Sequence, residues 1–269
     1  MSEVDRGDTA TPTVAVADPL TRFRLDGEVA VVTGASSGFG DRFARVLDSV
    51  GATVVVAARR ADRLEALAAD LHDPIVVPAD LSVAADRERL VAETLEQTGR
   101  LDVLVNNAGM SRPSGIDGET LDDFRDVIEL NVTAIWHLCK LSLDALIAGG
   151  VGSIVNIASV LGHVGSTPLK QAAYCTSKGA VVNMTRELAL QFARKNVRVN
   201  ALCPGWFPTE LTEGMEEDEA ARRFITTNTP MPRMGQLPEL DGALLLLASP
   251  AGSFLTGQSI IVDGGWTAR

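Results

Sequence analysis

At 269 residues with a net charge of −11, the chain is long enough for one large α/β domain, and no shift in composition requires a second. The acidic balance argues against a nucleic-acid partner, because a phosphate backbone is bound by a clustered basic face. Three cysteines, Cys139, Cys175 and Cys203, fit neither a disulfide framework nor a zinc-ligand spacing, which indicates a reducing compartment and no metal site.

The first 20 residues mix Asp, Thr, Pro and Ala without periodicity, so we predict a flexible tail over residues 1–20 and a single domain over residues 21–269. The N-terminus is acidic and lacks an apolar core of signal length, and the apolar stretches elsewhere are shorter than a membrane span. We therefore expect a cytoplasmic protein without a membrane partner.

From about residue 23, short β-branched runs alternate with longer amphipathic segments. Strands are expected at 29–33, 53–57, 75–77, 103–106, 153–157, 197–202 and 259–262, and helices at 39–50, 63–71, 87–97, 121–146, 173–194 and 237–248. The strand runs are almost continuously apolar, which is typical of a sheet covered on both faces. The pattern predicts a doubly wound parallel sheet in a three-layer α/β/α arrangement, the Rossmann fold.

A glycine-rich turn, Thr33–Gly40, joins the first expected strand to the first helix. A pyrophosphate can meet unpaired backbone N–H groups and the positive end of a helix at such a turn, and glycine lets it approach the backbone closely. A purely structural turn is the alternative, but the place of this one after the first strand favours a dinucleotide site. Its spacing is G-x-x-x-G-x-G rather than the commoner G-x-G-x-x-G. Cofactor contacts are expected from Gly34, Ser36, Ser37, Gly38, Phe39 and Gly40.

Tyr174 is the only tyrosine of the chain and lies four residues before Lys178. On a helix this spacing places phenol and ammonium on one face. A phenol titrates near pH ~10, so it works in proton transfer at neutral pH only when a neighbouring cation stabilises its ionised form. A tyrosine and a lysine that share a helix by accident are the alternative for the pair taken alone.

With Asn106–Gly109, Asn131 and Ser159 also in order, the chain resembles the short-chain dehydrogenase/reductases from roughly residue 23 to its end. The resemblance implies an enzyme that interconverts an alcohol and a ketone by hydride transfer to or from a nicotinamide cofactor. It implies that Tyr174 exchanges a proton with the substrate oxygen, while Lys178 favours the tyrosinate and holds the ribose hydroxyls of the cofactor.

The same resemblance implies that Ser159 hydrogen-bonds the developing alkoxide, and that the backbone carbonyl of Asn131 holds a water that relays protons to the lysine. Ser159 lies 15 positions before Tyr174, whereas about 13 is usual in the bacterial members compared. The loop at 162–168 is therefore expected to be extended and to reshape one wall of the substrate pocket. Within it, Ser166 or Thr167 is an alternative hydroxyl donor.

The end of the second expected strand bears on the choice of coenzyme. A carboxylate there would bind the ribose hydroxyls of NAD, but Ala58 occupies that place. Arg59 and Arg60 follow, and a guanidinium is suited to a 2′-phosphate. We therefore expect NADP rather than NAD, with a solvated arginine pair as the alternative.

The resemblance implies further cofactor contacts from three later segments. The pair at 80–81 would contact adenine, although Asp80 has the alternative of capping the following helix. The asparagine-rich strand end would support the sheet beside the cofactor, and Thr209 would bind the nicotinamide carboxamide. The implied positions are Asp80, Leu81, Asn107, Ala108, Gly109, Pro204, Gly205, Phe207 and Thr209.

Residues 210–234 combine acidic, methionine and proline residues without a clean apolar stripe, so they are a candidate lid over the substrate. The segments 228–235 and 262–266 resemble bacterial members that act on sugar acids and small polyols. A 3-oxoacyl-type reductase is the alternative substrate class. A non-catalytic NADP-binding sensor is the alternative of another kind, and its usual mark, a broken catalytic set, is not found here.

We also expect a homotetramer from the resemblance. Two expected helices, the one from Leu121 and the one from Ala173, carry broad apolar surfaces that an assembly would cover. The residues that suggest these surfaces are Ile135, Leu138, Val181, Met184 and Leu188.

Overall fold

Seven parallel strands form one sheet in the order β3-β2-β1-β4-β5-β6-β7. The structure, a computed structural model, describes residues 18–167, 169–215 and 217–268. The strands are β1 (Val29–Thr33), β2 (Thr53–Ala58), β3 (Ile75–Pro78), β4 (Val103–Asn106), β5 (Gly152–Ile157), β6 (Val197–Pro204) and β7 (Ser259–Val262). The doubly wound parallel sheet predicted from the sequence is confirmed.

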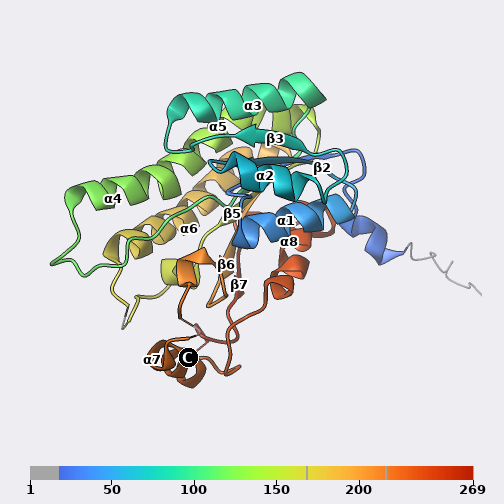
Figure 1. Cartoon of the computed structure of the whole chain (residues 1–269). Coiled ribbons are helices and arrows are strands. Elements are labelled where there is room, and N and C mark those ends of the chain that lie inside the picture. Colours follow the sequence, from blue (N-terminus) through green and yellow to red (C-terminus); the bar gives the residue numbers. More distant parts are fainter. Residues whose placement is uncertain (1–17, 168, 216, 269) are drawn as a thin grey trace, which may run out of the picture.

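Apart from α7, which lies beyond the sheet near the C-terminus, the helices divide between the two faces of this sheet (Figure 1). They are α1 (Gly38–Ser49), α2 (Ala61–Ala68), α3 (Ala84–Thr98), α4 (Leu121–Ile128), α5 (Ala134–Ala148), α6 (Ala172–Phe192), α7 (Glu219–Asn228) and α8 (Asp241–Ala248). On one face α3, α5 and α6 pack over Val31, and on the other α1, α2 and α8 pack over Val32. Successive side chains of a strand point to opposite faces, so continuously apolar strands fill both cores.

The strand order reverses between β1 and β4. The chain winds outward through β2 and β3 on one side of this point, and through β5, β6 and β7 on the other. The loops that leave β1 and β4 therefore separate at the carboxyl edge of the sheet, where open α/β sheets bind their ligands.

The long helix expected at 121–146 contains a break. Between α4 and α5, the segment Glu129–Thr133 is a π-helix. The whole helical stretch, Leu121–Ala148, is long and apolar enough to cross a membrane by length and composition, so the expectation that no stretch reaches that length was wrong. Here it forms part of a layer of the fold, where α5 packs against α3, β4 and β5.

Residues 18–20, assigned above to the tail, belong to an ordered part of the chain. Pro19–Phe23 is a 3₁₀ helix, and Asp18 caps it by accepting a hydrogen bond from the Leu20 N–H at 3.0 Å. The Arg22 guanidinium joins this helix to the turn that follows α8 by donating a hydrogen bond to the Pro250 carbonyl at 2.8 Å. The remainder of the predicted tail, residues 1–17, lies outside the described residues.

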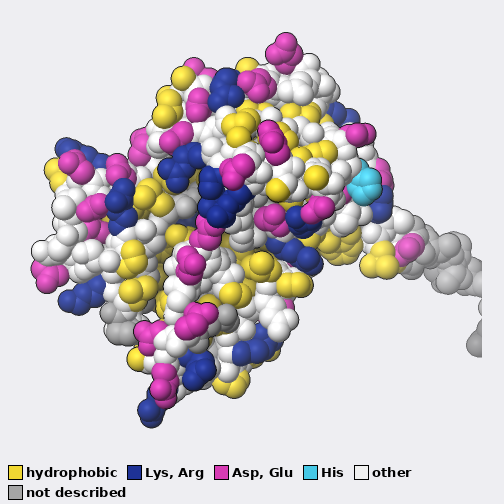
Figure 2. Space-filling model, viewed as in Figure 1, with side chains coloured by type: hydrophobic (Ala, Val, Ile, Leu, Met, Phe, Trp, Pro, Cys, Tyr) yellow, Lys and Arg dark blue, Asp and Glu magenta, His cyan; other side chains and the backbone are white. Residues whose placement is uncertain are grey.

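Four of the five apolar residues that suggested an assembly surface lie inside the subunit, and the fifth, Met184, is half-buried against the same core. Ile135, Leu138, Val181 and Leu188 are buried in the core on the α5–α6 face of the sheet, where they pack within the subunit. Other side chains on these helices are exposed, including Trp136 at 48% and Leu190 at 78%. On the face seen in Figure 2, positive and negative side chains are interspersed. The homotetramer stays a prediction.

Candidate functional site

A cleft of about 300 Å³ opens at the carboxyl edge of the sheet, beside the point where the strand order reverses. Most of the sequence-predicted cofactor residues meet there. Those that line the cleft are Gly34, Ser36, Ser37, Gly38, Phe39, Arg59, Arg60, Asp80, Leu81, Asn107, Ala108, Gly109, Tyr174, Lys178 and Thr209.

Four predicted positions lie outside this lining. Gly40 lies beneath the glycine-rich turn, and Pro204 is buried at the end of β6. Gly205 lines a smaller cavity next to the cleft. Phe207 is buried, and its ring packs edge-on against that of Phe39 with the centroids 5.6 Å apart.

The glycine-rich turn is held closely against the end of β4. A side-chain carbon at Gly34 would lie 2.8 Å from the Ala108 Cα, and one at Gly40 would lie 2.2 Å from the Gly34 carbonyl oxygen. The Asn107 Nδ2 donates to the Thr33 and Gly34 carbonyls at 2.9 and 3.2 Å. The Asn107 side chain therefore supports the turn.

The N-terminus of α1 is open towards the cleft. Its N-cap residue, Ser37, makes no capping hydrogen bond with its side chain. Backbone N–H groups of the first turn are therefore left for a ligand, and the helix dipole favours an anion there. This geometry fits the pyrophosphate of a dinucleotide.

Ser159, Tyr174 and Lys178 come together at the inner end of the cleft. Ser159 follows β5, and its hydroxyl lies close enough to the Tyr174 phenol, which projects from α6, to lower the pKa of that phenol. The Lys178 Nζ lies 5.5 Å from the centroid of the Tyr174 ring and donates to the Ile157 carbonyl at 2.7 Å. All three side chains are thus tied to β5 or to the first two turns of α6.

Burial shifts both titrating groups of this cluster. It raises the pKa of the Tyr174 phenol to about 12, although the Ser159 hydroxyl acts in the opposite direction. It lowers the pKa of the Lys178 ammonium to about 8. At neutral pH the phenol is therefore protonated and able to donate, and the ammonium is mostly charged.

Asn131 is completely buried in the π-helical segment. Its Oδ1 accepts from the Met110 N–H at 2.9 Å, and its Nδ2 donates to the Met110 carbonyl at 2.9 Å and to the Ser177 Oγ at 3.0 Å. The side chain therefore joins the loop after β4 to α6. π-Helical turns are frequent at functional sites, because they change the direction of a side chain within a helix.

The comparisons with known proteins agree with this geometry. A model of the family described as enoyl-(acyl carrier protein) reductase matches residues 34–267. The chain belongs to the short-chain dehydrogenase/reductase family. Membership makes it an NAD(P)-dependent dehydrogenase or reductase.

Two curated relatives are similar over almost their full length. The chain is 38% identical to galactitol 2-dehydrogenase (L-tagatose-forming) of Cereibacter sphaeroides, over 93% of this chain and 99% of that protein. It is 35% identical to gluconate 5-dehydrogenase of Gluconobacter oxydans, over 91% and 96%. The solved structure of a gluconate 5-dehydrogenase from Burkholderia cenocepacia in complex with NADP and tartrate matches with a TM-score of 0.88 and 33% identity, over 94% of this chain and 100% of that one.

In this short-chain dehydrogenase/reductase, the extended loop does not supply the hydroxyl beside Tyr174. The Ser166 Oγ accepts from the Gln171 Nε2 at 3.1 Å and donates to the Leu169 carbonyl, so it is bound within its own loop. Thr167 is exposed. Ser159 is therefore the serine in contact with the phenol. Residue 168 of this loop lies outside the described residues.

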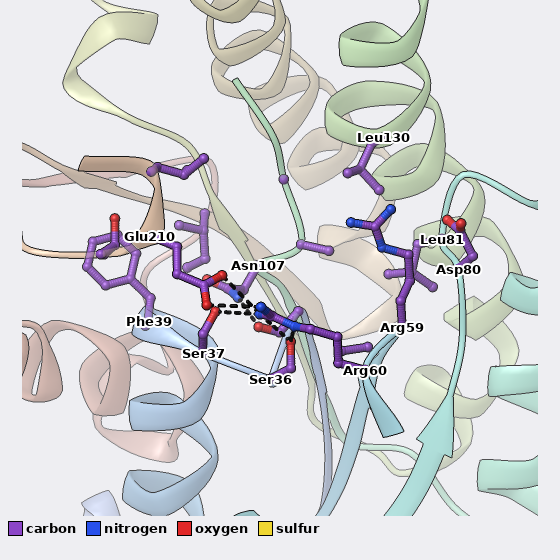
Figure 3. A pocket seen from close by; sticks show the side chains of 18 of the residues that line it. Ser36, Ser37, Phe39, Arg59, Arg60, Asp80, Leu81, Asn107, Leu130 and Glu210 are labelled. Atoms are coloured by element: carbon purple, nitrogen blue, oxygen red, sulfur yellow. Dashed lines mark hydrogen bonds and ion pairs between the residues drawn. The ribbon is translucent and has the colours of Figure 1, made fainter. Parts of the chain in front are cut away.

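The end of the cleft formed by the turn after β1 and the end of β2 contains an ion-pair cluster (Figure 3). The Arg60 Nη1 and Nη2 lie 2.9 and 3.0 Å from the two carboxylate oxygens of Glu210, and Arg63 pairs with the same carboxylate. Arg60 holds the pKa of Glu210 down to about 2. Arg59 points away from this cluster, towards Leu130, and makes no ion pair with a described residue.

Asp80 takes up a local structural role as well as lining the cleft. Its Oδ1 accepts from the Ser82 N–H at 3.0 Å and from the Ser82 hydroxyl at 2.7 Å, in the turn that precedes α3. The alternative that Asp80 caps the following helix is thus close to what is found, although the N-cap position itself is Val83.

A second cavity, of about 70 Å³, adjoins the cleft on the other side of Tyr174. No charged side chain of a described residue lines it. Its walls are mostly apolar, and its polar groups come from serine, threonine, glutamine and tyrosine. The main contributors are Ser159, Leu161, Gln171, Trp206, Leu211 and Met215.

Sequence reasoning missed several residues that line the cleft, among them Leu130, Glu210 and Leu211. Leu130 comes from the π-helical segment, and Glu210 and Leu211 come from the start of the candidate lid. Nothing in the local pattern of Glu210 indicates its partner, because Arg60 lies 150 positions earlier in the chain. Its place directly after Thr209, a predicted cofactor residue, is the one signal that would have brought it to attention.

Proposed function

We propose that this short-chain dehydrogenase/reductase interconverts a secondary alcohol and a ketone, with NADP(H) as the hydride carrier. The observation that carries the proposal is the meeting of Ser159, Tyr174 and Lys178 at the inner end of the cleft that the glycine-rich turn lines. A hydroxyl, a phenol and an ammonium that lie close together can polarise a carbonyl, protonate its oxygen and keep the proton donor supplied.

Each catalytic residue has a distinct role in this proposal. Tyr174 gives its proton to the carbonyl oxygen during reduction and takes the proton back during oxidation. The Ser159 hydroxyl donates to the same oxygen as charge develops there. Lys178 uses one N–H on the Ile157 carbonyl and has two left for the ribose hydroxyls. The Asn131 carbonyl holds the relay water.

The cofactor supplies or accepts the hydride, and residues on three sides of the cleft would hold it. The turn from Gly34 to Gly40 takes the pyrophosphate, Asp80 and Leu81 take the adenine, and Thr209 takes the carboxamide, supported by Pro204, Gly205 and Phe207. Asn107, Ala108 and Gly109 lie against the adenosine.

NADP is preferred to NAD in this proposal because Ala58 leaves no carboxylate to repel a 2′-phosphate, and because Arg59 and Arg60 supply cations. The related gluconate 5-dehydrogenase that was solved with NADP supports this choice.

An uncharged carbonyl compound is the substrate that the second cavity favours. A buried carboxylate is held best by a cation, and no described lining residue is charged, whereas the hydroxyl and amide groups of the lining suit neutral hydroxyl and carbonyl groups. Arg222 and Arg223 are exposed, and Arg233 is paired with Glu239. A neutral polyol or ketose, as in the galactitol 2-dehydrogenase relative, therefore suits the cavity better than a sugar acid. A 3-oxoacyl thioester is the second candidate, because apolar walls also accept an acyl chain.

The remaining features of the proposal are a lid, an assembly and a location. The segment 210–234 would close over the substrate, since its first residues line both the cleft and the second cavity. It contains α7, whose Phe224 packs against Trp266 near the C-terminal end (Figure 1). Residue 216 of the segment lies outside the described residues. We further propose a homotetramer in the cytoplasm, and a monomer by light scattering would refute the assembly.

The test is NADPH oxidation, with NADH alongside, against a panel of ketoses, keto sugar acids and β-ketoesters. The wild type is compared with Tyr174→Phe, Ser159→Ala and the matched control Ser166→Ala. We expect the first two variants to lose at least ~100-fold in kcat/KM while still binding NADPH, and the control to stay near wild type. Full activity in Tyr174→Phe would refute the mechanism. Tight NADPH binding without turnover on the whole panel would favour a sensor.

A further inference from the structure

At the adenosine end of the cleft, a carboxylate of the chain itself is paired with the Arg60 guanidinium, a group that could otherwise bind an anion. Glu210 lies against Arg60 with both of its oxygens, at 2.9 and 3.0 Å, in the two-pronged arrangement by which a guanidinium also binds phosphate. The Arg60 Nη2 donates in addition to the hydroxyls of Ser36 and Ser37, at 2.9 and 3.0 Å. Figure 3 shows these groups converging.

The cluster has the composition of a phosphate site, because it combines two guanidinium groups and two hydroxyls beside the open N-terminus of α1. Glu210 comes from the segment after β6, and its carboxylate lies where an anion would bind between these groups. The pKa of Glu210 is about 2, so the carboxylate stays ionised across the working pH range of an enzyme. Arg59, the neighbouring cation, has no such partner among the described residues.

We propose that Glu210 is a coenzyme-specificity residue that competes with the 2′-phosphate of NADP for Arg60. The inference rests on the proposed use of NADP. A phosphate and a carboxylate repel each other, so the phosphate can bind Arg60 only when Glu210 moves away. NAD has a hydroxyl in place of this phosphate and can bind with the ion pair intact. Glu210 therefore weakens the binding of NADP but not that of NAD. It reduces the preference for NADP over NAD that Arg59 and Arg60 create.

The decisive experiment measures the Kd values of NADPH and NADH, by nucleotide fluorescence, for the wild type and Glu210→Gln. We expect the variant to bind NADPH about tenfold more tightly, a change of ~1.4 kcal/mol, and to bind NADH within about twofold of the wild type. Glu239→Gln is the matched control, because Glu239 makes a similarly exposed two-pronged pair with Arg233 outside the cleft. It should change neither value.

A second pair of probes tests the phosphate without the nicotinamide half. Adenosine 2′,5′-bisphosphate should compete with the coenzyme more strongly in Glu210→Gln than in the wild type, whereas AMP should not. Equal tightening of NADPH and NADH, or weaker NADPH binding, in Glu210→Gln and in Glu210→Ala would overturn the proposal. If the wild type itself bound NADH more tightly than NADPH, the proposed coenzyme would be wrong, which is a separate failure.

Discussion

Replacing Asn131 by alanine should destabilise the fold strongly. The side chain is completely buried and makes three hydrogen bonds, two to the Met110 backbone and one to Ser177. Removing them leaves the Met110 N–H and carbonyl without their partners in a partly buried loop. At about 1 kcal/mol for each lost bond, the free energy of unfolding should fall by ~3 kcal/mol.

For a chain of this length such a loss corresponds to a fall in Tm of roughly 6–12 °C. The assay is thermal unfolding at a fixed protein concentration, because a change in assembly would also move the Tm. Asn131→Asp should be no better than alanine, since it replaces a donor by an anionic oxygen facing the Met110 carbonyl. Gln191→Ala, an exposed α6 position with one bond to Glu187, is the control and should lose less than ~0.5 kcal/mol.

A loss below ~1 kcal/mol in Asn131→Ala would refute the reasoning. It would mean that water replaces the side chain at no cost, so that Asn131 does not hold the loop after β4 against α6. The role of its backbone carbonyl in a proton relay would then be the only function left for this residue.

Two further predictions concern the glycine-rich turn and the lysine. Gly40→Ala should lower the Tm more than Gly38→Ala, although only Gly38 has a positive φ, of 56°, because the new carbon at Gly40 would lie 2.2 Å from a backbone oxygen and the one at Gly38 only 3.5 Å from Thr209. Equal losses on thermal unfolding would contradict this. The kcat/KM for reduction should fall as pH rises through about 8, because burial lowers the pKa of Lys178 to about 8 and only the ammonium can stabilise the tyrosinate. Lys178→Arg should move this limb to higher pH, and an unchanged limb would exclude the lysine as its source.

Much of the fold follows from the sequence because the strands are covered on both faces. The runs expected at 29–33, 103–106 and 259–262 coincide with β1, β4 and β7, since an apolar run flanked by turn residues has clear ends. Helix limits are less certain. The helix expected at 63–71 is found at Ala61–Ala68, because Arg60 at its N-cap makes no side-chain cap that the sequence would signal.

The candidate site was predictable where its residues are close in sequence, as for Tyr174 and Lys178 on one helix. Contacts between distant segments were not. Glu210 meets Arg60 across 150 positions, and no local pattern encodes such a pairing. Nor does an apolar pattern distinguish a core from an interface, so Ile135 was assigned to an assembly surface although it lies inside the subunit.

The Gln171 side chain has a consequence for how this scaffold can change over evolution. It lies at the N-cap of α6, where its Oε1 accepts from Ser111 at 2.9 Å and its Nε2 holds Ser166 at the end of the extended loop. The loop is therefore anchored to a residue that precedes Tyr174, while Ser159 is fixed separately by β5. Insertions and deletions between these anchors can remodel the substrate wall without disturbing proton transfer. Family members that differ in substrate, but share the same proton and hydride transfer, need to alter only this stretch.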